Sequence, residues 1–382
     1  MRQPCELLAL TALEHSRSSV AGGDHHVEQR REHPDHGLDP ALELDVRGGA
    51  GHWPQCTVRQ VLPAASPLRT ASPSGACPAC GGQLSAWRSV RSSEPALGSE
   101  RFALARCGRC GSAVTLGDLP AGAYESGAYR PGAPRLHWAA RPVLNMFDRQ
   151  RLSLVRSLVA APARLLDAGA GRGRFVAAAQ AAGYEASGIE PSSRGAQAAA
   201  AIGAPVRQAS IEQASVQASS LDVVTLWHVL EHLDDPGDAL SRVASWLRPG
   251  GGVVIGVPNL DSLQARIAGE RWYHLDVPRH RIHFTPTGLH QLLRSHGFAV
   301  LGTHHGLLEH NPFGMWQSLV SRLTRQPSYA YNMLKRNAPL RSPDLVISAA
   351  ALPLAPLAAA IELGAGLVGR GGTIAVLARR GD

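Results

Sequence analysis

An acidic residue followed by alternating glycines is the feature of this sequence best suited to binding a ligand. Asp167 ends an apolar run, and Gly169, Gly171 and Gly173 precede an alanine-rich segment. This order predicts a strand, a tight loop and the N-terminus of a helix, which is where α/β proteins bind nucleotide-like cofactors. Because glycine has no Cβ, the loop backbone can lie close to such a ligand.

The spacing of these glycines differs from the dinucleotide fingerprint G-x-G-x-x-G, because Arg174 occupies the place of the third glycine. A carboxylate at Asp167 can accept a hydrogen bond from an ammonium group, which a nicotinamide cofactor lacks. Glu190 ends the next apolar run, about 20 residues further on, and can accept both hydroxyls of a ribose. The pattern therefore argues against a nicotinamide cofactor.

Two C-x-x-C pairs, each followed by a glycine, lie before the glycine loop. Their cysteines are Cys77, Cys80, Cys107 and Cys110. Four thiolates predict a closed tetrahedral zinc site with a structural role. A disulfide pair and two redox motifs are the alternatives, which a reducing compartment disfavours. Cys5 and Cys56 have no partner at comparable spacing.

Strand-like and helix-like segments alternate between residues 163 and 302. Regular alternation predicts βαβ units and an α/β fold, with a parallel sheet covered by helices on both faces. The predicted strands are 164–167, 186–190, 206–209, 223–227, 252–257 and 299–302, with a further strand at 373–378. The predicted helices are 136–158, 175–182, 193–201, 236–246 and 287–296.

Four motifs follow one another along this region. They are D-x-G-x-G-x-G from Asp167, the acid Glu190, HVLEHLDDP at 228–236 and LRPGG at 247–251. Together they resemble class I S-adenosylmethionine (SAM)-dependent methyltransferases, nearest the type 11/23 branch that includes ubiquinone-biosynthesis O-methyltransferases. The resemblance covers residues 124–380. It implies a Rossmann-like, seven-stranded sheet whose last strand is antiparallel, with an apolar helical insertion at about 303–370.

The resemblance also implies the residues that bind SAM. They are Asp167, Gly169, Gly171, Gly173, Glu190, Ser210, Ile211, Trp227 and His228. The aspartate and the glycines would hold the methionine end, and Glu190 would bind the ribose hydroxyls. Ser210 and Ile211 would meet the adenine, although many relatives have an acid in place of Ser210. Trp227 and His228 would line the region of the sulfonium.

Methyl transfer from a sulfonium is an in-line displacement, so the protein mainly aligns the reactants and excludes water. A hydroxyl or acidic-carbon acceptor also needs a base, and histidine suits that role near neutral pH. The candidates are His232, His280 and His283, of which the last two lie where this fold commonly has substrate loops. Packing roles are the alternative. Arg279 and Arg281 would hold an anionic group of the acceptor or face solvent.

The motifs divide the chain into three parts. Residues 1–75 show no sustained periodicity and are predicted to be disordered, or to be an extension from an over-extended gene model. Residues 76–118 are predicted to form a zinc ribbon, and residues 119–382 the SAM-dependent methyltransferase domain. Without a convincing signal peptide, the expected location is cytoplasmic.

Residues 345–368 are very apolar but contain two prolines and Glu362. This is too short and too interrupted to predict a membrane span, which needs about 20 apolar residues. A buried helical pair is the favoured interpretation, and a helix in the membrane interface is the alternative. The net charge of +8 permits an anionic partner such as nucleic acid or a membrane surface.

These observations predict an enzyme that methylates a small-molecule, sugar or lipid-linked acceptor, with O-methylation favoured. Two alternatives remain: an RNA base methyltransferase guided by the zinc ribbon, and a non-enzymatic zinc scaffold. The ribbon has only Trp87 and Phe102 as aromatic residues, which disfavours RNA binding. The intact acids Asp167 and Glu190 and the glycine loop disfavour a non-enzymatic scaffold. The sequence does not define the oligomeric state.

Overall fold

The computed structural model describes residues 75–92, 97, 100–119, 137–334, 338, 340 and 342–381, together with one short strand pair nearer the N-terminus. The chain divides into two compact units, 1–71 and 72–382. In the first unit, β1 (Glu43–Asp45) pairs antiparallel with β2 (Thr57–Arg59). The rest of the predicted N-terminal extension lies outside the described residues, as do Cys5 and Cys56.

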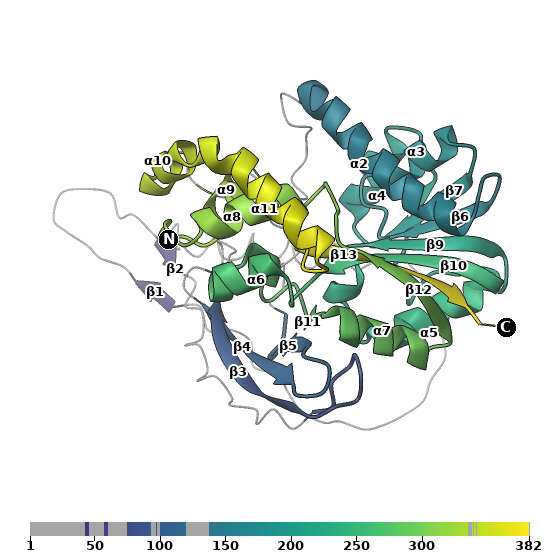
Figure 1. Ribbon diagram of the computed structural model, residues 1–382, viewed down its shortest axis with the longest axis horizontal. Helices are drawn as coiled ribbons and strands as arrows, with labels where there is room; N and C mark the ends of the chain where they lie inside the picture. The colour runs from purple at the N-terminus through teal and green to yellow at the C-terminus, as the bar shows by residue number, and fades with distance from the viewer. Residues whose placement is uncertain are drawn as a thin grey trace, which may run out of the picture. The chain divides into compact units, whose positions relative to one another are not determined.

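A seven-stranded sheet is the centre of the second unit (Figure 1). Its order is β12-β13-β10-β9-β6-β7-β8, and only β13 runs antiparallel to its neighbours. The strands are β6 (Arg164–Ala168), β7 (Glu185–Glu190), β8 (Val206–Gln208), β9 (Leu221–Trp227), β10 (Leu247–Pro258), β12 (Phe298–His304) and β13 (Thr373–Arg380). The predicted fold class is therefore confirmed, including the antiparallel last strand.

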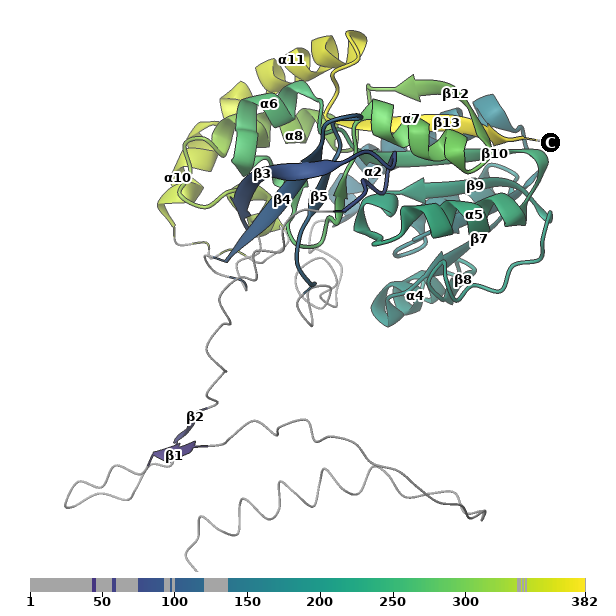
Figure 2. The same ribbon diagram turned by 90° about the horizontal axis from the view of Figure 1, so that it is seen from below.

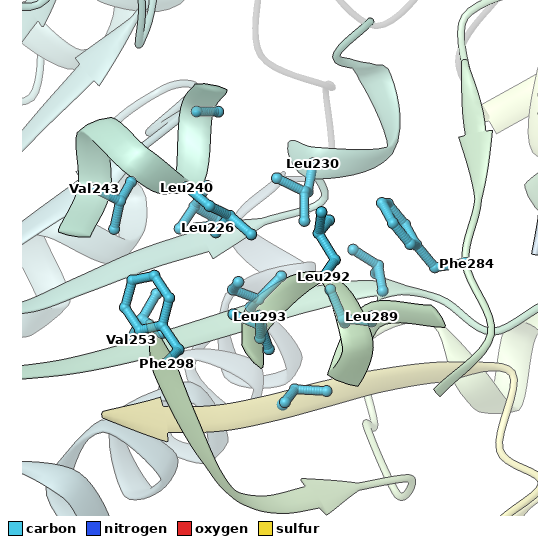
Figure 3. Packing of buried hydrophobic residues seen from close by; sticks show 14 of the residues in the cluster. Leu226, Leu230, Leu240, Val243, Val253, Phe284, Leu289, Leu292, Leu293 and Phe298 are labelled. Atoms are coloured by element: carbon cyan, nitrogen blue, oxygen red, sulfur yellow. The ribbon is translucent and has the colours of Figure 1, made fainter. Parts of the chain in front are cut away.

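Helices cover both faces of this sheet because neighbouring residues of a strand point to opposite sides. Val253 packs in one core cluster with residues of α5 (Pro236–Trp246) and α7 (Pro286–Ser295). Val254 packs in another with residues of α2 (His137–Leu158) and α3 (Arg174–Ala181). A further helix, α4 (Ser193–Ala200), contributes Ala199 to the second cluster. Figure 3 shows part of the first cluster.

The cysteine-rich segment forms a second, four-stranded sheet with the order β11-β5-β4-β3 (Figure 2). Its strands are β3 (Leu84–Arg91), β4 (Arg101–Cys107), β5 (Ala113–Thr115) and β11 (Ile282–His283). The last strand comes from the segment between β10 and α7, so residues of the large domain complete the ribbon sheet. Thr285 strengthens this junction by donating from Oγ1 to the carbonyl of Cys110 at 2.7 Å.

The chain between β12 and β13 is helical. Its helices are α8 (Asn311–Val320), α9 (Tyr329–Leu334), α10 (Pro343–Ala350), η6 (Leu352–Leu354) and α11 (Ala355–Leu367). One side of α11 packs on α8, and both lie near α6 (Leu263–Ala268). Only 22% of the most apolar 18-residue window within Pro343–Leu367 is buried. The interpretation of residues 345–368 as a buried helical pair is therefore wrong for the side of these helices that faces away from α8, which is exposed.

Gly288 tests the junction between the ribbon and α7. A Cβ at this position would lie 2.1 Å from Oγ of Ser112 and 3.2 Å from Sγ of Cys110. We expect Gly288→Ala to lower the free energy of unfolding by about 1–3 kcal/mol, because neither the strand end nor the helix can yield freely. The control is Gly302→Ala in β12, where a Cβ meets no atom within 4 Å. Equal free energies of unfolding for Gly288→Ala and Gly302→Ala in urea denaturation would contradict close packing between the ribbon and α7.

Candidate active site

The glycine loop between β6 and α3 has three left-handed residues with different surroundings. A Cβ on Gly169 (φ +79°) would lie 2.3 Å from Cγ2 of Val229, and one on Gly173 (φ +73°) would lie 2.6 Å from Cβ of Ala204. A Cβ on Gly171 (φ +54°) meets no atom within 4 Å. The outer glycines are thus required by packing, whereas Gly171 borders open space where a ligand can approach.

Glu190 joins the loop to the end of β7. Its Oε2 accepts the backbone N–H of Gly171 at 2.8 Å, and its Oε1 accepts that of Ser192 at 3.0 Å. The side chain is buried and also lines a cavity. Since each carboxylate oxygen has a second lone pair, Glu190 can accept two hydroxyl groups while keeping both backbone contacts.

Asp167 lies behind the glycine loop at the end of β6. It is 3% exposed, and its Oδ1 accepts the hydroxyl of Thr225 at 2.6 Å. Burial raises the pKa of Asp167 to about 6, although the hydrogen bond from Thr225 and the charge of Arg151 oppose the shift. A buried carboxylate of this kind favours a cationic ligand group such as an ammonium.

The cavity beside Glu190 has a volume of about 700 Å³, which is within the range of small-molecule and cofactor sites. Six predicted residues line it: Gly169, Glu190, Ser210, Ile211, His228 and His232. The other predicted residues do not line it: Asp167, Gly171, Gly173, Trp227, His280 and His283. The Trp227 ring packs edge-on against Phe175, with a centroid distance of 6.1 Å, and Arg151 lies over its face. The structure therefore places Trp227 in the core beside the site.

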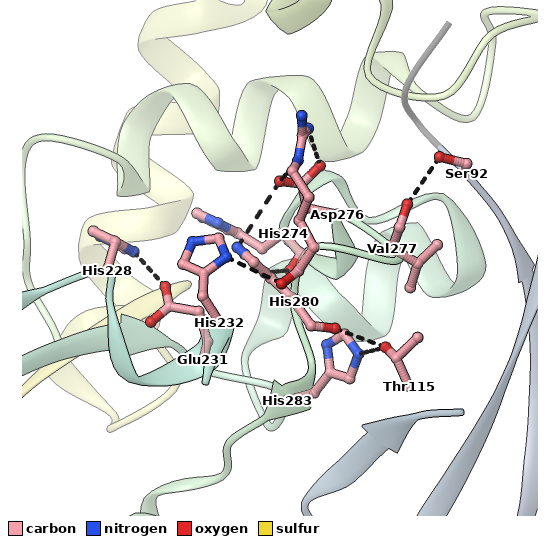
Figure 4. A network of polar contacts seen from close by, with 11 residues as sticks. Ser92, Thr115, His228, Glu231, His232, His274, Asp276, Val277, His280 and His283 are labelled. Carbon is pink, nitrogen blue, oxygen red and sulfur yellow. Dashed lines mark hydrogen bonds and ion pairs between the residues drawn. The ribbon is translucent and has the colours of Figure 1, made fainter. Parts of the chain in front are cut away.

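The three candidate bases have different surroundings (Figure 4). His283 is buried, lies 3.0 Å through Nε2 from Oγ1 of Thr115, and does not line the cavity. Burial lowers the pKa of His283 to about 3. His280 is also buried, and burial holds its pKa well below the ordinary value. His232 is the candidate that lines the cavity, with its ring centroid 4.7 Å from that of His280.

Two further polar residues belong to this region, Glu231 and Arg281, and neither was predicted as a catalytic or cofactor-binding residue. Glu231 is 1% exposed, and burial raises its pKa to about 7. Its Oε1 lies 3.0 Å from Nδ1 of His228. Arg281 lines the cavity and donates from Nε to Asp234 at 2.7 Å, whereas its buried NH1 has no hydrogen-bond partner in the described part of the chain. Arg279 instead pairs with Asp276 at 2.6 Å.

An ion-pair network next to Asp167 was not predicted. Arg151 of α2 pairs with Glu309 at 2.5 Å, and Arg174 pairs with Asp148 at 3.0 Å. Glu309 follows β12, more than 150 residues after Arg151, so no local pattern relates the two. The network links the helical insertion to the helix that follows the glycine loop.

The four ribbon cysteines lie together. Sγ of Cys77 is 3.7 Å from Sγ of Cys110, and Sγ of Cys80 is 3.5 Å from Sγ of Cys107. Four ligands about 2.3 Å from a tetrahedral zinc ion are about 3.8 Å apart, and a disulfide would need about 2.05 Å. Backbone N–H groups of Gly82 and Arg109 point at two of these sulfurs. The donor set therefore fits a structural metal ion.

Residues 140–303 match a family model described as a methyltransferase domain. These residues contain the glycine loop, Glu190 and the cavity-lining histidines. Together with the sheet order and its antiparallel last strand, the match supports a SAM-dependent methyltransferase. No curated protein sequence matches the chain.

The solved structures similar to this chain share little of its sequence. The [4+2]-cyclase SpnF is 18% identical, covering 61% of this chain and 80% of that chain, with a TM-score of 0.42. The Burkholderia thailandensis 1,6-didemethyltoxoflavin-N1-methyltransferase is 19% identical, covering 71% and 96%, with a TM-score of 0.38. A SAM-dependent methyltransferase from Archaeoglobus fulgidus is 20% identical, covering 60% and 92%, with a TM-score of 0.40.

The raised pKa of Asp167 predicts a pH-dependent stability. Because the folded state binds the proton more tightly than the unfolded state, this contribution is present at low pH and is lost as pH rises through about 6. We expect wild type to lose about 2 kcal/mol of unfolding free energy from this group between about pH 4 and pH 7.5. Asp167→Asn should remove that loss in urea denaturation, and the exposed Asp118→Asn should not. Identical pH profiles for Asp167→Asn and wild type would contradict the assignment.

Proposed function

We propose that this enzyme transfers the methyl group of SAM to a hydroxyl group of a small-molecule, sugar or lipid-linked acceptor. The observation that carries the proposal is one cavity lined by Glu190, by the loop glycine Gly169 and by His232. Cofactor-binding groups and groups able to activate a hydroxyl therefore face the same space.

Different residues of the chain would bind different parts of the cofactor. Glu190, held by two backbone N–H groups, would accept the ribose hydroxyls. Asp167 would stabilise the ammonium of the methionine end from behind the loop. Ser210 and Ile211, which also line the cavity, would contact the adenine. SAM supplies an electrophilic methyl group, and the protein aligns the acceptor with it and excludes water.

The acceptor would lie at the part of the cavity formed by His232 and Arg281. A guanidinium with an unused buried N–H favours an acceptor rich in oxygen atoms, since oxygen lone pairs can satisfy it. His232 would take part in activating the acceptor hydroxyl. These features support O-methylation, and they also suit a sugar or a phosphorylated headgroup.

We also propose that the ribbon binds one structural zinc ion through Cys77, Cys80, Cys107 and Cys110. Because four thiolates close the coordination sphere, this ion would stabilise the ribbon rather than bind substrate. The ribbon in turn pairs with β11, which precedes α7 and follows the cavity residue Arg281. Its role would therefore be to fix the segment that borders the acceptor.

An exposed apolar surface supports association with a membrane at its cytoplasmic face. The segment Pro343–Leu367 is long and apolar enough to cross a membrane by length and composition, with mean hydropathy 1.9. This segment and the residue that follows it, Val368, carry eight exposed large apolar side chains. They are Val346, Leu352, Leu354, Leu357, Ile361, Leu363, Leu367 and Val368. Such a surface fits a lipid interface and would bring the enzyme to a lipid-linked acceptor.

Contacts on the inward side favour a helix that lies on the membrane over one that spans it. Oε1 of Glu362 accepts the backbone N–H of Gly372 at 2.7 Å, and the glutamate is 2% exposed. The indole N–H of Trp316 donates to the carbonyl of Ala351 at 2.9 Å. A spanning helix would break both contacts and move Glu362 into hydrocarbon, which is costly.

Cofactor binding tests the proposed function. We expect wild type to bind SAM in calorimetry and Gly171→Trp to lose more than about 100-fold in affinity, about 2.7 kcal/mol, because the indole fills the open space at the loop. Gly203→Trp is a matched control, since Gly203 also has positive φ and open space but follows α4 and is not part of the glycine loop. The control should bind SAM like wild type. Absence of SAM binding to wild type would refute the proposal.

Vesicle binding tests the apolar surface. Leu357 and Leu367 are 60% and 90% exposed, so the double variant Leu357→Asp/Leu367→Asp should fold normally. We expect it to lower co-sedimentation with anionic phospholipid vesicles by about tenfold or more, because two apolar side chains no longer enter the interface. The control Ile202→Asp/Leu301→Asp changes two apolar residues that are 57% and 56% exposed and lie outside this segment. Equal sedimentation of both double variants would contradict membrane contact.

A further inference from the structure

Two histidines and one buried carboxylate lie together at the border of the cavity. One ligand atom each from Glu231, His232 and His280 lies within 4.8 Å of the other two. Glu231 and His280 are buried, and His232 lines the cavity. We propose that these three residues bind a divalent transition-metal ion with open coordination positions that face the acceptor.

Backbone carbonyls orient both imidazoles. Nδ1 of His232 lies 3.1 Å from the carbonyl oxygen of Arg279, and Nδ1 of His280 lies 2.7 Å from that of His274. A carbonyl oxygen only accepts, so each Nδ1 carries the proton and each Nε2 carries the lone pair. Metal-binding histidines in proteins are oriented in this way, with the second ring nitrogen donating to a carbonyl or a carboxylate.

Glu231 is oriented by a neighbouring side chain. Its Oε1 lies 3.0 Å from Nδ1 of His228, whereas its buried Oε2 has no hydrogen-bond partner among the residues described. A buried carboxylate oxygen without a partner is costly unless a cation or a donor occupies the space beside it. Glu231 therefore offers the third ligand atom, and His228 holds it in place.

The other charged groups around the triad do not neutralise the carboxylate of Glu231. Asp276 approaches Nε2 of His280 to 4.0 Å, but its carboxylate is engaged by Arg279 at 2.6 and 3.0 Å. Arg281 pairs with Asp234 at 2.7 Å. These charges pair with one another, which leaves Glu231 as the buried acid that a metal ion would compensate.

The donor set defines the class of metal. Two imidazoles and one carboxylate suit Zn²⁺, Mn²⁺, Fe²⁺ or Co²⁺, whereas Mg²⁺ and Ca²⁺ prefer oxygen ligands. Three protein ligands leave coordination positions open, unlike the closed set of four cysteines in the ribbon. Metal–nitrogen distances of about 2.1 Å place ligand atoms about 3.4 Å apart in a tetrahedron. Since the ligand atoms of the triad lie within 4.8 Å of one another, their separations would contract by at most about 1.4 Å on binding.

The consequence for catalysis rests on the proposed function. An acceptor hydroxyl bound at an open position would lose its proton to water more readily, because the metal ion stabilises the resulting oxyanion. A lone pair of that oxygen would then form the bond to the methyl carbon, and the carbon–sulfur bond would break with its electron pair on sulfur. His232 would act as a metal ligand, so no histidine base would be required.

Titration of full-length protein with Mn²⁺ tests the site, because Mn²⁺ competes poorly for a four-thiolate ribbon. We expect electron paramagnetic resonance to show one bound Mn²⁺ per chain with couplings to histidine nitrogens. Glu231→Gln and His280→Asn should each weaken binding by about 100-fold or more, since changes to outer contacts alone cost 10–100-fold. His290→Asn is the matched control, since His290 contacts Thr303 and lies outside the triad.

The readouts separate this inference from the proposed function. SAM binding is measured by calorimetry on the same samples. The zinc content is measured before the titration, because one zinc ion per chain belongs to the ribbon and a second would occupy the triad. Wild type that binds SAM but not Mn²⁺, or bound Mn²⁺ without nitrogen couplings, would overturn the metal site and leave the methyltransferase proposal intact. Wild type that binds Mn²⁺ but not SAM would do the reverse. If a triad variant fails to fold, the nitrogen couplings of wild type still decide the question.

Discussion

Two backbone hydrogen bonds to the carboxylate of Glu190 hold the ends of β6 and β7 together, and the site is built around them. The N–H of Gly171 reaches the carboxylate from the loop after β6, and the N–H of Ser192 reaches it from the start of α4. An ionised acceptor makes such bonds stronger than bonds between neutral groups. Parallel strands end at one edge of the sheet, so this contact also fixes how far the loop stands from β9 and its histidines.

The pairing of β11 with β5 gives the ribbon a structural connection to the same edge. The two residues of β11 are too few to hold a strand alone, but His283 contacts Thr115 and the hydroxyl of Thr115 also donates to the carbonyl of His280 at 2.7 Å. The ribbon thereby holds the backbone on both sides of Arg281. His283 contributes to the site through this position, since its own ring is enclosed and lies away from the cavity.

The sequence allowed prediction of those parts that depend on neighbouring residues. Alternating strand and helix patterns predicted the sheet, and an acid before glycines predicted the loop, because each pattern reports local backbone geometry. Pairings across the chain could not be predicted. Neither Arg151 with Glu309 nor Thr115 with His283 leaves a local signal. Apolar composition at residues 345–368 suits a core and a lipid surface equally, so only the packing shows that the outward side is exposed.

The end of β9 explains why one short motif places several functional side chains. His228 adopts a left-handed conformation (φ 56°), which stops the strand, and η3 (Leu230–His232) follows as a single 3₁₀ turn. Three residues complete such a turn, so His228 and Glu231 lie on one side and form their contact. Leu230 is fully buried in the core and anchors the turn. The next residue, His232, lines the cavity.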